Sequence, residues 1–281
     1  MLGSVLHYAR HYPVRAVSAL RADPLGLLET LQDRLVQERE YRRPPCTYEV
    51  TPDWERQLYA QLRLSYPGAT ISEFETLWPQ VVASVRANGV DVGPESFNGY
   101  NDGDAALVRV IWCLVRHLKP TNVVETGVAH GFTSRFILEA LQRNGAGQLS
   151  SIDRPPLDPA MQKQIGIAIG GRLRHRWTLI AGTSRRCLPA LLSRLGTIDL
   201  FIHDSLHTER NVRFELDRAW ARLRPGGALV VDDVDSNWGF HSFLKAYPDN
   251  ANLVCEAEPV RPDPRRFNKK GLFGILLKKS V

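Results

Sequence analysis

Short apolar segments alternate with amphipathic segments along the chain from residue 104 onward. The apolar segments have the length of strands and are apolar on both faces, which predicts an α/β domain whose parallel sheet is covered on both sides. Strands are expected over residues 122–126, 148–153, 177–181, 198–203, 227–232, 252–257 and 271–278. Helices are expected over residues 105–118, 132–143, 158–169, 184–194, 208–223 and 238–246. No convincing helix separates the last two strands, so we expect the final one to run antiparallel to its neighbour.

The first part of the chain carries a different pattern, which favours helices and irregular segments. One helix is expected to begin at Ser72, with Glu75 three residues later as a capping box, and Pro79 should kink or restart it. We therefore expect a helical N-terminal extension over residues 1–103 and a second domain over residues 104–281. Within the extension, helices are also expected over residues 25–36 and 54–64, and a connector over residues 98–104.

The formal net charge of +6 is concentrated near the C-terminus. Seven basic residues after position 260 face a single acid, Asp263, and the first 22 residues carry three arginines and no acid. Such segments are most often solvated faces, so no nucleic-acid partner is expected, while contact of the basic termini with a membrane surface stays open. The seven basic residues are Arg261, Arg265, Arg266, Lys269, Lys270, Lys278 and Lys279.

Two further observations limit the class of protein. No apolar run approaches the roughly 20 residues that a membrane-spanning helix needs. The four cysteines, Cys46, Cys113, Cys187 and Cys255, are scattered and form no C-x-x-C pair, so neither a zinc knuckle nor a disulfide framework is expected. We interpret them as thiols in a reducing compartment and expect a cytoplasmic protein.

After the first predicted strand the sequence reads ETGVAHGFTS and then opens a helix. Gly127 permits a sharp turn, while Ala129 and Gly131 keep side-chain bulk away from a ligand pressed against the backbone. The N–H groups at the helix start, together with the hydroxyls of Thr133 and Ser134, can hold an anion. The turn therefore predicts a cradle for a pyrophosphate or for the carboxylate of a methionine moiety, although a purely structural tight turn would look similar.

The spacing of small residues distinguishes between these ligands. A dinucleotide fingerprint that starts at Gly127 would need glycine at positions 129 and 132, where the chain has Ala129 and Phe132. The second strand ends in Asp153, about 20 residues past the turn, where an acid can accept hydrogen bonds from ribose hydroxyls. The third strand ends in AGTS, in which Thr183 and Ser184 either cap the next helix or meet an adenine edge.

The runs VVETGVAHGFTS, SSID, AGTS, IDLFIHDSLHTE and LRPGGALVVDD together resemble the class I S-adenosylmethionine (SAM)-dependent methyltransferases, over roughly residues 100–281. Within that superfamily the chain is most similar to small-molecule O-methyltransferases of the catechol and macrocin type. The resemblance implies a Rossmann-like seven-stranded sheet in the order 3-2-1-4-5-7-6 with the seventh strand antiparallel. It also implies that SAM contacts Glu125, Gly127, Val128, Ala129, Gly131, Thr133, Ser134, Asp153, Thr183, Ser184 and Asp204.

Acidic residues follow the fourth and fifth strands, as HDSLH and VDDVD. Neighbouring strand ends bring Asp204 close to Asp232 and Asp233, and three carboxylates repel one another unless a cation or a proton is present. Oxygen ligands suit Mg²⁺. In catechol-type enzymes such positions hold the ion that lowers the pKa of a substrate hydroxyl, so we predict all three aspartates as metal ligands. The alternative is that Asp232 and Asp233 only cap the following helix.

His207 is the candidate general base, because related sequences also tend to carry histidine three residues after the first acid. Where the family often has D-G-D-H, this chain has D-S-L-H, so Leu206 removes any acid–base role at that position. Asp204 and His207 are therefore the predicted catalytic residues. His130, inside the glycine turn, is expected to shape the SAM pocket rather than to react.

The sequence thus predicts methyl transfer from SAM to a hydroxyl of a small molecule, assisted by Mg²⁺. A sugar hydroxyl of a glycoside and a phenolic natural product are both open as acceptors. The alternatives are a metal-independent methyltransferase with His207 as base, and a non-catalytic SAM-fold binding protein. Clustering several carboxylates is energetically costly, which disfavours the non-catalytic binding protein. Ala129 and Phe132 disfavour a nicotinamide oxidoreductase. We expect a homo-oligomer, in which the N-terminal extension supplies a lid, acceptor-pocket residues or dimer contacts.

Overall fold

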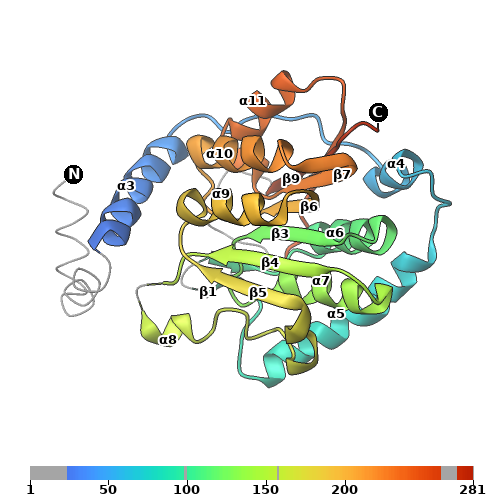
Figure 1. Cartoon of the computed structure of the whole chain (residues 1–281), viewed down its shortest axis with the longest axis horizontal. Coiled ribbons are helices and arrows are strands. Elements are labelled where there is room, and N and C mark those ends of the chain that lie inside the picture. Colours follow the sequence, from blue (N-terminus) through green and yellow to red (C-terminus); the bar gives the residue numbers. More distant parts are fainter. Residues whose placement is uncertain (1–23, 98–99, 157, 261–270, 281) are drawn as a thin grey trace.

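The computed structural model describes residues 24–97, 100–156, 158–260 and 271–280, and a seven-stranded sheet lies at its centre (Figure 1). The order of its strands is β5-β4-β3-β6-β7-β9-β8. All neighbours are parallel except β9, which is antiparallel to both β7 and β8. Counted from β3, this is the order 3-2-1-4-5-7-6, so the predicted Rossmann-like sheet is confirmed. The strands are β3 (Asn122–Thr126), β4 (Gln148–Asp153), β5 (Trp177–Ala181), β6 (Ile198–His203), β7 (Leu223–Val231), β8 (Ala251–Glu256) and β9 (Leu272–Leu277).

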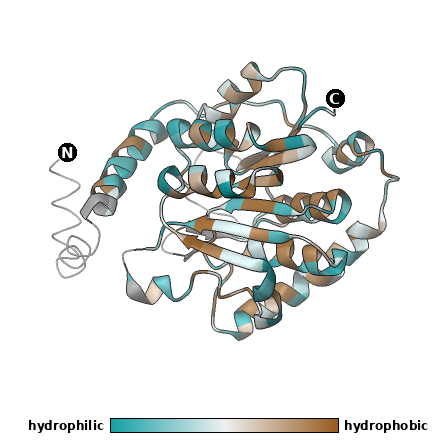
Figure 2. Ribbon diagram, in the orientation of Figure 1, coloured by the Kyte–Doolittle hydropathy of each residue, from teal (hydrophilic) through white to brown (hydrophobic). Residues whose placement is uncertain are grey.

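Helices cover both faces of the sheet. One layer contains α6 (Ala105–Leu118) and α7 (Phe132–Asn144), and the other contains α9 (Ser184–Leu195), α10 (Glu209–Trp220) and α11 (Gly239–Ala246). Successive strand residues are buried in opposite layers, as Val123 packs in the first and Val124 in the second. The strands consequently carry apolar residues on both faces, and Figure 2 shows hydrophobic segments along them beside the hydrophilic outer turns of α10.

The N-terminal extension contains three described helices and a hairpin. Helices α4 and α5 bury Leu58, Phe74 and Val81 in the same apolar cluster as α6 and α7, so they extend the core on that face. Helix α3 lies instead beside α9 and α10 (Figure 1). These elements are α3 (Pro24–Tyr41), α4 (Trp54–Gln61), α5 (Ala69–Ala87), and the strands β1 (Gly93–Phe97) and β2 (Tyr100–Asp102).

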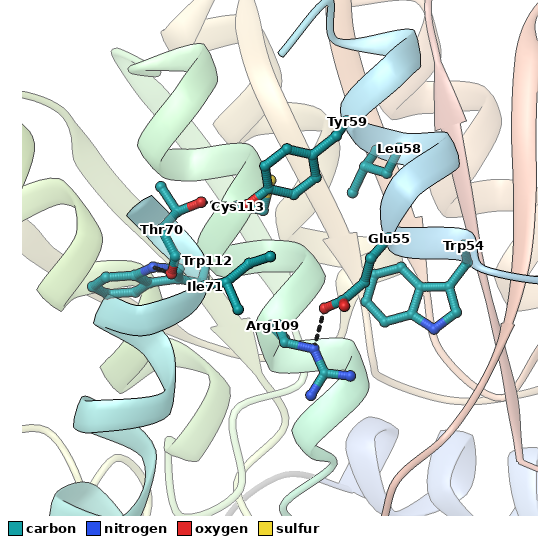
Figure 3. Close-up of a pocket in the computed structure, with 9 residues that line it drawn as sticks. All are labelled: Trp54, Glu55, Leu58, Tyr59, Thr70, Ile71, Arg109, Trp112 and Cys113. Atoms are coloured by element: carbon teal, nitrogen blue, oxygen red, sulfur yellow. Dashed lines mark hydrogen bonds and ion pairs between the residues drawn. The ribbon is translucent and has the colours of Figure 1, made fainter. Parts of the chain in front are cut away.

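Figure 3 shows a small cavity where α4, α5 and α6 meet. Its volume of about 10 Å³ leaves room for about one water molecule, so it holds no organic ligand. Arg109 of α6 pairs there with Glu55 of α4 at 2.5 Å and with Glu258 at 3.1 Å. Its guanidinium also lies 5.4 Å from the ring centroid of Trp54. Arg109 thus joins the extension to α6 and to Glu258, which stands two residues after the end of β8.

One predicted helix is wrong. In place of a helix over residues 158–169 the structure has the short α8 (Pro159–Gln162), turns, and the 3-10 helix η1 (Gly171–Arg176). Gly166 has a φ of +67°, and an added Cβ would lie 2.4 Å from the ring of Trp177. Backbone bonds from Gly166 N to Ala129 O (3.0 Å) and from Ala168 N to His130 O (2.9 Å) hold this segment against the glycine turn. Tertiary contact with the turn therefore replaces the helix.

Two smaller predictions for the extension are also wrong. Helix α5 begins at Ala69 with Gly68 as its N-cap, and the hydroxyl of Ser72 donates to Ala69 O at 3.0 Å, so there is no capping box at Ser72. Pro79 lies within α5, which continues past it. The predicted connector over residues 98–104 contains strand β2, which pairs with β1.

Most of the predicted basic termini lie outside the described residues, namely residues 1–23 and 261–270. Lys278 is described and is not a solvated charge, because its Nζ donates to Trp220 O at 2.8 Å and to Leu223 O at 2.7 Å. It thereby satisfies the carbonyl of Trp220 at the C-terminal end of α10 and that of Leu223 at the start of β7. All four cysteines are free thiols, as expected. Among the described residues, no helix has both the length and the apolarity that crossing a bilayer requires.

Candidate active site

The turn between β3 and α7 is formed by residues with left-handed backbone conformations. Gly127 has a φ of +85°, Ala129 of +48° and Gly131 of +80°. A Cβ at Gly127 would lie 1.8 Å from the carbonyl oxygen of Asp204, and one at Gly131 would lie 2.8 Å from Cα of Gly166. Glycine is therefore required at both positions by conformation and by close backbone approach. The turn is held directly against the loop that carries Asp204.

Two of the predicted SAM-binding side chains support this turn from inside the fold. Glu125 is 1% exposed, and its carboxylate accepts hydrogen bonds from the hydroxyls of Ser134 (2.6 Å) and Ser151 (2.7 Å). Ser134 is fully buried, whereas Thr133, in the first turn of α7, is partly exposed. Of the two residues predicted to offer hydroxyls at the helix start, only Thr133 is accessible to solvent.

Asp153 lies at the end of β4, next to the turn. Its Oδ2 accepts hydrogen bonds from the backbone N–H groups of Val128 and Ala129, each at 3.0 Å. Burial raises the pKa of Asp153 to about 6, although these backbone bonds oppose the shift. The carboxyl group thus joins the end of the second parallel strand to the glycine turn and titrates close to neutral pH.

The end of β5 completes this side of the site. Gly182 N donates to Asp153 O at 2.8 Å, which places the two strand ends together. Thr183 occupies the N-cap position of α9 without a side-chain capping bond. Ser184 is buried, and its hydroxyl donates to Asn211 Oδ1 at 3.4 Å. The two residues therefore have different environments, and only Ser184 is engaged with α10.

The acids that follow β6 and β7 converge with His207. His207 Nε2 lies 3.9 Å from Asp204 Oδ1 and 4.0 Å from Asp232 Oδ2, while its Nδ1 lies 3.8 Å from Asp233 Oδ2. Backbone bonds from Asp204 N to Thr126 O and from Asp232 N to His203 O, each 2.9 Å, fix the adjacent strand ends. Carboxyl ends of parallel strands thus bring four residues together that are up to 29 positions apart.

The grouping of donor atoms differs in detail from the predicted metal site. Asp204, His207 and Asp232 each offer an atom within 4.8 Å of the others. Asp233 stands on the other side of the imidazole, with a φ of +48° at the N-cap position of the 3-10 helix η2 (Val234–Ser236). Its side chain makes no capping bond there. The structure therefore gives no support to capping as the role of Asp233.

Negative charge accumulates at this cluster. The pKa of Asp204 is raised well above its usual range, first by burial, then by the charge of Asp232 and a hydrogen bond to it, and further by Asp233 and Glu125. A carboxyl group in such surroundings is relieved by a proton or a cation. The cluster is therefore suited to holding a positive charge.

A buried hub that the sequence analysis missed lies beneath the cluster. Glu215 of α10 is fully buried and accepts hydrogen bonds from Thr126 (2.5 Å), His203 Nδ1 (2.6 Å), Ser205 (2.7 Å) and Asn211 (2.9 Å). Burial alone would raise its pKa, but His203 and the hydroxyls of Ser184 and Thr126 outweigh it and lower the pKa to about 2. The ionised hub fixes the loop from Ser205 to His207.

The sequence gives only a weak indication that Glu215 is buried and shared by several donors. Glu215 lies three residues after Val212 and one before Leu216, both buried, so an acid falls on the apolar face of its helix. Its partners outside α10 come from β3, β6 and the loop after β6, which a local pattern does not reveal.

Comparisons with known proteins agree with this geometry. Residues 124–234 match a family model described as a methyltransferase domain, a range that contains the glycine turn, Asp153 and the acidic cluster. The 8-demethyl-8-alpha-L-rhamnosyl tetracenomycin-C 2'-O-methyltransferase of Streptomyces olivaceus is 32% identical over 90 residues, which is 30% of this chain. The match spans only 24% of that relative's length.

The fold is also similar to a solved structure. A crystal structure of a proposed O-methyltransferase from Klebsiella pneumoniae superposes with a TM-score of 0.52 at 16% identity, over 81% of this chain and 96% of the other. This likeness concerns the fold, and it includes the sheet described above. Residues 124–234 therefore match a methyltransferase domain, and the sheet that contains them is consistent with the fold of the class I SAM-dependent methyltransferases.

Proposed function

We propose that the protein transfers a methyl group from SAM to a hydroxyl of a small molecule. The observation that carries this proposal is the contact between the glycine turn and the acidic cluster. Gly127 lies against the carbonyl of Asp204, and Asp204 lies 3.9 Å from His207. A cofactor held on the turn would thus have its reacting end beside a base and a group of carboxylates.

SAM would lie along the carboxyl ends of β3, β4 and β5. The unpaired N–H groups in the first turn of α7 and the hydroxyl of Thr133 suit its carboxylate. Asp153, ionised at neutral pH, suits the ribose hydroxyls, and the end of β5 at Thr183 suits the adenine. Glu125 and Ser134 would act by holding the turn in place, since their side chains bond each other.

The donor atoms of the cluster fit a divalent cation. Asp204 and Asp232 offer carboxylate oxygens, which are the ligands that Mg²⁺ prefers, and Asp233 lies on the other side of His207. A cation bound there would supply Lewis acidity that lowers the pKa of a substrate hydroxyl. If His207 were itself a ligand, it could not serve as the base, so the two roles exclude each other.

In the reaction proposed here, His207 accepts the proton of the substrate hydroxyl. The hydroxyl oxygen then attacks the methyl carbon as the bond to the sulfonium sulfur breaks, giving a methyl ether and S-adenosylhomocysteine. The imidazolium would be stabilised by Asp204, Asp232 and Asp233, whose oxygens lie 3.8 to 4.0 Å from its nitrogens. The proton finally leaves to solvent.

A sugar hydroxyl of a glycoside is the acceptor class that we favour. The Streptomyces olivaceus relative is named for methylation of a 2'-hydroxyl in a rhamnosyl tetracenomycin, and its likeness to this chain covers 90 residues. A phenolic natural product is the second class, because a positioned base and a cation would act on either kind of hydroxyl.

Titration calorimetry with SAM, in the presence and absence of Mg²⁺, tests the proposal. We expect SAM binding in both conditions, and methylation of members of a glycoside panel that stops when EDTA is added. No SAM binding at millimolar ligand would overturn the proposed function. Turnover that persists in EDTA would overturn the metal requirement and favour His207 acting alone.

The affinity for SAM should fall as the pH falls through about 6. The pKa of Asp153 is raised to about 6, so the carboxyl is ionised above that pH and protonated below it. Protonation removes an acceptor for ribose hydroxyls, and at about pH 5 roughly a tenth of the carboxyls stay ionised, which predicts about tenfold weaker binding than at pH 7.5. Calorimetry across this range measures the effect. Asp153→Asn should bind weakly at every pH, and an equal Kd for the wild type at both ends would contradict the assignment.

A further inference from the structure

Helix α3 is attached to the carboxyl edge of the sheet by polar contacts rather than by an apolar face. Leu28 and Val36 are 52% and 37% exposed. Among the residues of α3 whose side chains are described, Asp33 alone is buried, at 6% exposure. A helix whose buried contact is a carboxylate is held by the partners of that carboxylate.

Those partners are two arginines, one from the loop after β4 and one from the first turn of α9. Asp33 Oδ2 lies 3.0 Å from Arg154 Nη1, and Oδ1 lies 2.7 Å from Arg185 Nη2. The arginine side chains are 32% and 28% exposed, so the carboxylate is shielded while its partners keep some contact with water. Each oxygen makes its own charge-assisted hydrogen bond, and the pair of bonds fixes the separation of the two guanidinium groups.

Both arginines adjoin the residues proposed for the adenosine moiety. Arg154 directly follows Asp153, and Arg185 directly follows Ser184, two positions after Thr183. The two strand ends are already neighbours, since Asp153 pairs with Ala181 in the β4–β5 register. Asp33 therefore bridges the loop after β4 and the first turn of α9, the two segments that would flank the ribose and the adenine.

We propose that Asp33 is a positioning residue for the cofactor, which fixes the loop after β4 against the first turn of α9 and places α3 over the adenosine end of the site. This inference rests on the proposed function. Two further contacts join the other parts of α3 to α9 and α10, namely Glu29 with Arg186 at 3.1 Å, and Glu40 Oε2 accepting from Glu209 N at 2.9 Å.

Asp33→Asn, Asp33→Glu and the control Glu29→Gln test the role of Asp33. Glu29 lies on the same helix and also pairs with an arginine of α9, but its side chain is 27% exposed and this pair does not involve the loop after β4. We expect Asp33→Asn to raise the Kd for SAM about tenfold and the Kd for adenosine by the same factor, because the loss lies at the adenosine end. Asp33→Glu keeps the charge and should stay within about threefold of the wild type, and Glu29→Gln within about twofold.

Hydrogen exchange of the unliganded protein gives a second measurement that needs no cofactor. Amides of residues 153–156 and 182–186 should exchange faster in Asp33→Asn, while those of α7 and the melting temperature change little. A Kd for SAM within twofold of the wild type, or equal weakening by Glu29→Gln, would overturn the inference. If the wild type bound no SAM, the proposed function would fail, and unchanged exchange in Asp33→Asn would overturn the loop-fixing role separately.

Discussion

Replacing His207 with alanine should lower kcat between about 100-fold and 10,000-fold, the range typical for loss of a general base. The imidazole lies within 4.0 Å of three carboxylates, so it is placed to take a proton and to have the resulting charge stabilised. The Kd for SAM should change less than about twofold, because no side-chain atom of His207 is part of the glycine turn. Single-turnover methylation of a glycoside acceptor measures the first quantity, and calorimetry the second.

The matched control for this variant is His175→Ala. His175 is exposed in η1, where its Nδ1 is 2.9 Å from Arg172 O, and its loss should leave kcat unchanged. Activity that returns to the wild-type level at high Mg²⁺ would show that His207 acts as a metal ligand. Full activity of His207→Ala without added metal would remove it from the mechanism.

Glu215→Ala should lower the free energy of unfolding by about 3–5 kcal/mol, the cost of removing one partner from a buried charged network. Thr126, His203, Ser205 and Asn211 would all lose their shared acceptor. For a protein of this size such a loss lowers the melting temperature by about 10 °C. Urea denaturation monitored by circular dichroism gives the free energy directly.

The control for the hub is Asp217→Ala on the same helix. Asp217 is 45% exposed and pairs with Arg213 one turn away at 3.0 Å, so its loss should cost no more than about 0.5 kcal/mol. The pKa of Glu215 is lowered to about 2, so its contribution to stability is complete above about pH 4.5 and is lost as the pH falls towards 2. Equal losses for both variants at neutral pH would contradict a special role for Glu215.

The candidate site could be predicted from the sequence where its residues follow strands directly. Gly127, Asp204 and Asp232 directly follow a strand and Asp153 ends one, and parallel strands end at the same edge of a sheet. The contacts between individual carboxylates and the His207 ring could not be predicted in this way. Asp233 and His207 lie outside regular strands and helices, where no local periodicity indicates which carboxylate faces which ring nitrogen.

The sequence by itself determined the strands and most helices of the sheet layers, because apolar periodicity is a local property. It also determined that the final strand is antiparallel, because the sequence between the last two strands lacks a helical pattern. The tertiary structure decided the rest through contacts between distant residues. Packing against the glycine turn replaced the helix predicted over residues 158–169. Glu215 became the acceptor for four donors, and Asp33 reached Arg154 and Arg185 across 121 and 152 positions. Whether a polar side chain is buried depends on the partners that the fold brings to it, and a local pattern contains no information about them.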